Sequence, residues 1–166
     1  MNRTIRQRAL DLAARLAALY AGATLLPFGM DKLQGTGGSI QGFRQIGAGF
    51  GVDPTFFRFF VGAQEVSVAL LLFAAIFVDF GGRLPRLEAV ARRLTQLGAL
   101  GLVATMVGAL ATEAIVRPGQ QDWLVRIALR LLAVGVFATL WSIRRYGLPR
   151  AVARVLPAKL TPVTGL

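Results

Sequence analysis

Four long apolar segments follow one another along the chain, separated by shorter segments in which glycine, proline and charged residues gather. Each is about as long as the roughly 20 helical residues that cross the hydrocarbon core of a bilayer. The segments lack the strict alternation of polar and apolar residues that marks the strands of a membrane barrel. The pattern predicts four membrane-spanning helices, which run approximately over residues 10–28, 56–78, 95–116 and 123–143.

Two shorter segments have the spacing of amphipathic helices. In residues 39–50 the large apolar side chains recur at intervals of three and four: Ile40, Phe43, Ile46 and Phe50. We expect a short helix in the outer interface there, with Ser39 as its N-cap. Residues 147–166 form a basic tail with the pattern of a helix on the inner membrane surface. The expected fold is all-α, with a four-transmembrane-helix bundle over residues 1–146, short interfacial amphipathic helices and this cytoplasmic tail.

Composition supports a membrane protein. Of the 166 residues, 55% are hydrophobic and 16% are charged, whereas soluble domains carry about 25% charged residues. The chain has no cysteine and no histidine, so we expect no disulfide, no metal or haem site and no histidine relay. The net charge of +11 does not indicate a nucleic-acid partner, because the basic residues stand at the ends of apolar segments.

The basic residues also predict the orientation of the chain. Twelve lysines and arginines flank the spans on one side, and only Lys32, Arg44 and Arg117 lie in the loops of the other side. Because cytoplasmic flanks are enriched in lysine and arginine, both termini are expected in the cytoplasm, with the protein in a bacterial inner membrane. Asp11 and Arg15 interrupt the first apolar segment, which favours a retained span over a cleaved signal peptide.

Six charged residues stand within or beside the spans, all toward the outer side: Lys32, Arg58, Glu65, Glu113, Arg126 and Arg130. A charge at the centre of a bilayer costs about 2.5–3.5 kcal/mol on insertion scales, so we expect these residues to pair. Matched depth along the helices favours Glu65 with Arg130 and Glu113 with Arg126. Lys32 is the alternative partner for Glu65.

Two interpretations of these charges stay open. The pairs could lock the helices in register, or they could line an outward-facing polar pocket for a quinone head group or a small anion. Two acids face four bases in this set. That excess of positive charge favours a carbonyl or an anionic ligand over a cation.

A family resemblance rests on two segments, LYAGATLLPFGMDKLQG at 19–35 and GVDPTFFRFFVGAQEVSVALLLFAAI at 51–76. With the two spans that follow, they make residues 10–143 similar to the DoxX family of four-helix membrane proteins. The features that carry the resemblance are Lys32 at the end of the first span, and Gly62 with Glu65 in the second. The resemblance implies a membrane partner of a quinone-linked or sulfur-linked oxidoreductase. The chain lacks the histidine that often follows the third span in this family and has Glu113 in that region.

The expected function is that of an accessory membrane subunit of a quinone-linked redox or energy-transducing complex. The chain carries no flavin, haem or metal signature, so a subunit is favoured over an enzyme acting alone, and any quinone or lipid would be bound rather than intrinsic. Its expected partners are membrane lipids and other integral membrane subunits. The alternatives are a structural helix bundle in a larger assembly and, last, a small transporter, for which the chain shows no inverted repeat or broken helix.

The charge distribution gives a direct test of topology. Because the chain has no native cysteine, single cysteines introduced at positions 37 and 119 are unique labels. We expect a membrane-impermeant maleimide to label both from outside intact cells. Labelling only after the membrane is permeabilised would reverse the topology.

Overall fold

The computed structural model describes residues 3–80, 85–118 and 122–147 and is all-helical over them, as the sequence predicts. Four helices are long and apolar enough to cross a membrane, and one is short. The tail predicted over residues 147–166 lies outside the described residues apart from Gly147. The helices are α1 (Arg3–Gln34), α2 (Gly37–Phe50), α3 (Pro54–Phe80), α4 (Pro85–Val116) and α5 (Asp122–Tyr146).

The long helices extend beyond the predicted spans, and α1 is an example. The first span was predicted to end at residue 28, but α1 continues through Pro27 to Gln34. Proline is tolerated in membrane helices because neighbouring groups satisfy the backbone that it frees. α1 ends at Gly35, whose φ of 71° is the left-handed conformation that favours glycine. This ending places Lys32 in the last turn of α1.

The short helix α2 matches the amphipathic segment, but its predicted N-cap is wrong. Thr36 occupies the N-cap position and Ser39 lies inside the helix. The reason is that α1 ends immediately before, so α2 starts within two residues of Gly35. Phe43 and Ile46 are buried against the bundle. The ring of Phe43 lies 5.8 Å from that of Phe57 in α3.

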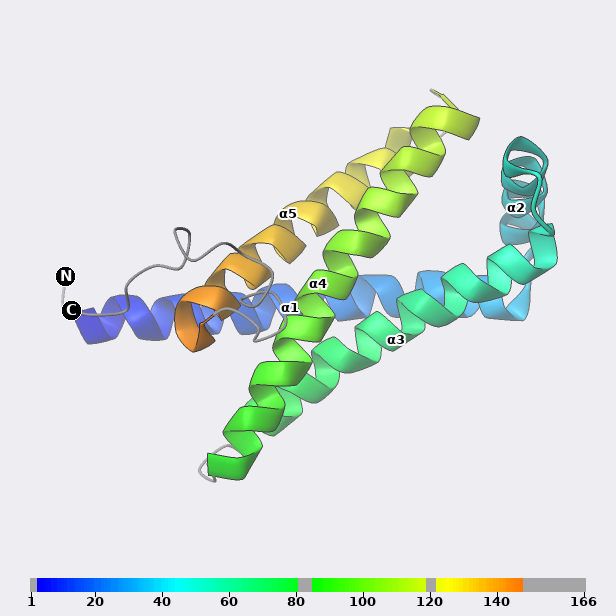
Figure 1. Cartoon of the computed structure of the whole chain (residues 1–166). Helices are drawn as coiled ribbons and strands as arrows, with labels where there is room; N and C mark the ends of the chain where they lie inside the picture. Colours follow the sequence, from blue (N-terminus) through cyan, green and yellow to red (C-terminus); the bar gives the residue numbers. More distant parts are fainter. Residues whose placement is uncertain (1–2, 81–84, 119–121, 148–166) are drawn as a thin grey trace, which may run out of the picture.

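The four long helices pack as a ring in which each contacts two others. α1 packs on α3, α3 on α4, α4 on α5, and α5 returns to α1. In Figure 1, α3 and α4 lie together where α3 ends and α4 begins, and they diverge toward the end that holds α2. α2 packs on α3 and contacts α4 and α1 at this wider end.

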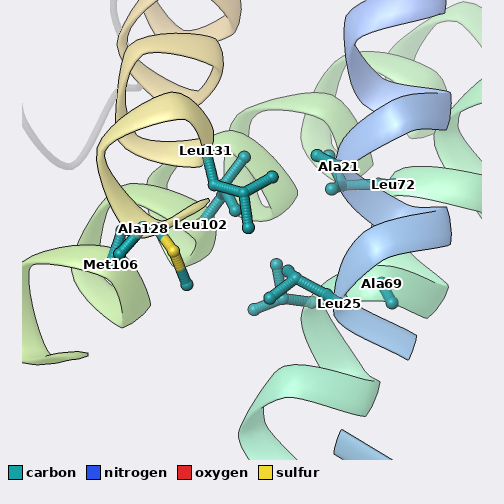
Figure 2. Packing of buried hydrophobic residues seen from close by; sticks show 9 residues of the cluster. Ala21, Leu25, Ala69, Leu72, Leu102, Met106, Ala128 and Leu131 are labelled. Carbon is teal, nitrogen blue, oxygen red and sulfur yellow. The ribbon is translucent and has the colours of Figure 1, made fainter. Parts of the chain in front are cut away.

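A layer of leucines fills the centre of the ring. Each long helix contributes one leucine that is at most 1% exposed: Leu25, Leu72, Leu102 and Leu131. Figure 2 shows Leu25, Leu102 and Leu131 converging between the helices, and the small residues Ala21, Ala69 and Ala128 belong to the same buried cluster. Small and large residues on facing helices fill the interior in the way that close packing requires.

Glycines set how closely the helices approach. At Gly22 of α1, a Cβ would lie 2.8 Å from the ring of Phe73 in α3. At Gly62 of α3, a Cβ would lie 3.0 Å from the backbone oxygen of Gly29 in α1. At Gly101 of α4, a Cβ would lie 2.9 Å from the side chain of Val68 in α3, whereas a Cβ at Gly108 would meet nothing within 4 Å.

These contacts predict different effects for one substitution at two glycines. Gly62→Ala places a methyl group against α1 backbone, so we expect a loss of about 1–3 kcal/mol in unfolding free energy. Gly108→Ala has room for the methyl group and gains helix propensity, so it should be neutral or slightly stabilising. Thermal unfolding in detergent measures both, and equal midpoints for the two variants would contradict the close approach of α1 and α3.

Candidate functional site

Lys32 and Glu65 form an ion pair between α1 and α3. Lys32 Nζ donates to Glu65 Oε2 at 2.6 Å, and the two side chains are 17% and 7% exposed. Gly62, one turn before Glu65, lets the backbone of α1 come close enough for this contact. The pairing of Glu65 predicted with Lys32 is thus confirmed, and the pairing with Arg130 is wrong.

Arg58 holds the end of α1 on which Lys32 stands. Its buried guanidinium donates to the backbone oxygen of Lys32 and lies 4.6 Å from the centroid of the Phe59 ring. A cation at a helix C-terminus satisfies carbonyls that lack a partner within the helix and interacts favourably with the helix dipole. Arg58 therefore positions Lys32, and it does not line the cavity described below.

Glu113 pairs with Arg117, four residues further along the chain. Both side chains are buried, and Arg117 Nη2 donates to Glu113 Oε1. The predicted pairing of Glu113 with Arg126 is wrong for this reason. Arg117 was assigned to an outer loop from the sequence, yet its spacing of four from Glu113 was the signal that could have found this pair. Glu113 Oε2 and Arg117 Nε are buried without a hydrogen-bond partner among the described residues.

Arg126 and Arg130 lie on the exposed side of α5 and form no ion pair with the described residues. The buried face of α5 is defined by Ala128, Leu131 and residues further along the helix. Arg130 precedes Leu131 by one residue, which is a rotation of about 100° around the helix. Arg126 and Arg130 have the depth along the bundle that their predicted partners require, but their side chains lie on the exposed side of α5.

A cavity of about 260 Å³ lies between the helices beside these pairs. Leu25 and Leu131 of the leucine layer line one end of it. Four phenylalanines contribute to its walls: Phe28, Phe43, Phe57 and Phe60. The polar residues in its lining are Lys32, Gln64, Glu65, Thr105, Thr112, Glu113 and Arg117.

The charges that line the cavity balance. Among the described residues they are the two acids and two bases of the pairs Lys32–Glu65 and Glu113–Arg117. The sequence predicted more bases than acids around the pocket. Among the described residues the cavity lining has no such excess, because Arg58, Arg126 and Arg130 lie outside it. A balanced lining favours an uncharged ligand over an anion.

Three side chains in the cavity wall have hydrogens left for a ligand: Arg117, whose Nε has no partner among the described residues, Lys32 and Gln64. The Lys32 ammonium carries three, of which one goes to Glu65 and one, at 3.4 Å, to the backbone oxygen of Phe28. The Gln64 amide carries two and donates one to Thr105 Oγ1 at 3.0 Å. Sequence reasoning missed Gln64, since a neutral amide in an apolar segment carries no distinctive pattern.

The described residues hold no group of three or more acidic side chains that could bind a metal ion. Comparison of the chain with protein-family models, with curated proteins and with solved structures finds no match.

The Lys32–Glu65 contact predicts a non-additive double-mutant cycle. Lys32→Met leaves a lone buried carboxylate and Glu65→Gln a lone ammonium, and removing one partner of a buried pair costs about 3–5 kcal/mol. We expect the double variant to be more stable in detergent than the sum of the single losses allows. Arg130→Gln, on the exposed side of α5, is the control and should change the unfolding free energy by less than about 0.5 kcal/mol. Plain additivity would show that the two side chains do not interact.

Proposed function

We propose that this chain is the membrane subunit of a quinone-linked redox complex and that its cavity binds the quinone head group. The four long apolar helices support an integral membrane protein. The observation that carries the rest is the Lys32–Glu65 pair in the wall of an otherwise largely apolar cavity. The resemblance of residues 10–143 to the DoxX family, which rests on Lys32, Gly62 and Glu65, points to the same role.

The chemistry of the cavity suits a quinone better than a small anion. A quinone ring is flat, uncharged and carries carbonyl oxygens that accept hydrogen bonds. Lys32 and Gln64 have the donors for such oxygens, and the phenylalanines supply apolar and aromatic surface for the ring. The volume of about 260 Å³ lies below the range of about 300–1,000 Å³ for whole small-molecule sites, which fits a head group without its tail.

In this proposal the chain binds and orients, and a partner subunit supplies the electrons. Glu65 holds the Lys32 ammonium in one direction, and Arg58 fixes the end of α1 from which Lys32 projects. A donor held in place before the ligand arrives loses little freedom on binding. The quinone is the ligand on which the chemistry takes place, and the partner carries the redox cofactor.

A second candidate function is a structural helix bundle within a larger assembly. The observation that favours it is that Lys32 and Glu113 both already have an ion partner within the chain. A bundle of this kind needs no ligand, whereas the proposed function requires one to bind.

Binding of a quinone analogue to the purified protein in nanodiscs separates the two. We expect saturable binding that Gln64→Leu weakens by about tenfold, since a lost hydrogen bond to a ligand is worth about 1–1.5 kcal/mol. Gln64→Leu leaves both ion pairs in place and removes the hydrogen bond to Thr105, so the free energy of unfolding should fall by only about 1 kcal/mol. Arg126→Gln is the control, because Arg126 is exposed on α5 and lies outside the cavity. An absence of saturable binding to the unmodified protein would leave the structural bundle as the better account.

A further inference from the structure

Buried side chains line both ends of the cavity along the bundle axis. The leucine layer forms its inner end. Across the outer end lies α2, with Phe43 and Ile46 buried in the cavity lining. The backbone of α2 comes close to the end of α4: a Cβ at Gly49 would lie 2.8 Å from Val116, and one at Gly42 would lie 3.2 Å from Arg117 Nη1. α2 therefore covers the side that faces the outer aqueous phase in the predicted topology.

The side of the cavity between α3 and α4 is more exposed than its two ends. Among the lining residues described, those with exposed side chains or surfaces are Phe60 of α3, and Ala104 and Gly108 of α4. Phe60 is 56% exposed, and a Cβ at Gly108 would meet no atom within 4 Å. These residues border the space between α3 and α4, which diverge toward α2 in Figure 1.

The depth of these residues places that space within the lipid. Gly108 lies eight residues before the end of α4 at Val116, which is about 12 Å along the helix. Phe60 lies four residues after the start of the predicted second span at residue 56, which is about 6 Å. The hydrocarbon core is about 30 Å thick, so both positions fall in its outer half.

We infer that the cavity opens sideways into the bilayer between α3 and α4, and that its ligand is a membrane-dissolved amphiphile with an uncharged polar head and an apolar tail. The head group enters past Phe60 and Gly108 and reaches Lys32 and Gln64, while the tail remains in the gap. The identity of the head group rests on the function proposed above; the sideways opening rests on the geometry alone. The apolar border and the covered outer end disfavour a ligand that arrives from water.

A unique cysteine inside the cavity tests the opening without any assumption about the ligand. Ala128 lines the cavity from α5 and is 8% exposed, and the chain has no native cysteine. In the Ala128→Cys variant reconstituted in vesicles, N-cyclohexylmaleimide dissolved in the bilayer should react faster than a sulfonated, membrane-impermeant maleimide.

Filling the gap between α3 and α4 should remove the faster reaction of N-cyclohexylmaleimide. Gly108→Phe, added to Ala128→Cys, fills open space at the border and should slow the bilayer reagent by about tenfold, which is about 1.4 kcal/mol in the barrier. Ala111→Phe is the matched control, because Ala111 is exposed on α4 but lies outside the cavity lining; it should leave the rate unchanged. Equal rates for the two reagents, no reaction with either, or no effect of Gly108→Phe would each overturn the sideways opening.

The same proteins separate this inference from the proposed function. If labelling follows the expected order but no quinone analogue binds, the opening stands and the head group is of another chemistry. If a quinone analogue binds and Gly108→Phe leaves both labelling and binding unchanged, the head group stands and the sideways opening is wrong.

Discussion

The ion pair between Lys32 and Glu65 is the interaction on which the half of the bundle next to α2 depends. Either charge alone would be expensive inside the membrane, and the cost is offset only because the two atoms meet at 2.6 Å. Two features of the structure make this contact between Lys32 and Glu65 possible. Gly62 must lack a side chain where α1 and α3 touch, and α1 must end just before Gly35, with Arg58 bound to the backbone oxygen of Lys32. Close backbone contact through small residues is a common means of joining membrane helices, and here it serves to bring a charged pair together.

The rest of the site follows from how the helices separate beyond this contact. α3 and α4 diverge toward the end of the bundle that holds the short helix α2. The leucine layer closes the interior below, so the space that remains is a cavity and not a channel through the protein. Its lining joins aromatic walls to two balanced ion pairs. A site that is mostly apolar and has a few fixed polar groups is the usual form of a small-molecule site.

Much of the fold could be predicted from the sequence, because hydrophobic length fixes membrane spans and a period of three to four fixes α2. The partner choices were harder. Arg130 has the right depth for Glu65 but stands one residue from Leu131 on the buried face of α5, so it points away from the bundle. Depth follows from residue number alone, whereas the direction of a side chain depends on which face the neighbouring helices cover. Gln64 was missed as a cavity residue because a neutral amide in an apolar helix has no distinctive pattern, whereas Arg117 could have been found from its spacing of four from Glu113.

Exchanging the two charges tests the central pair most directly. Lys32→Glu alone and Glu65→Lys alone each place two like charges together in the interior, and each should fail to give a monodisperse protein in mild detergent. The combined exchange restores an ion pair of the same total length. It should be recovered in better yield and unfold at a higher temperature than either single exchange, although below the unmodified chain, because a carboxylate at the C-terminus of α1 opposes the helix dipole. A combined variant no more stable than the single exchanges would contradict a direct pairing of these residues as the basis of the structure.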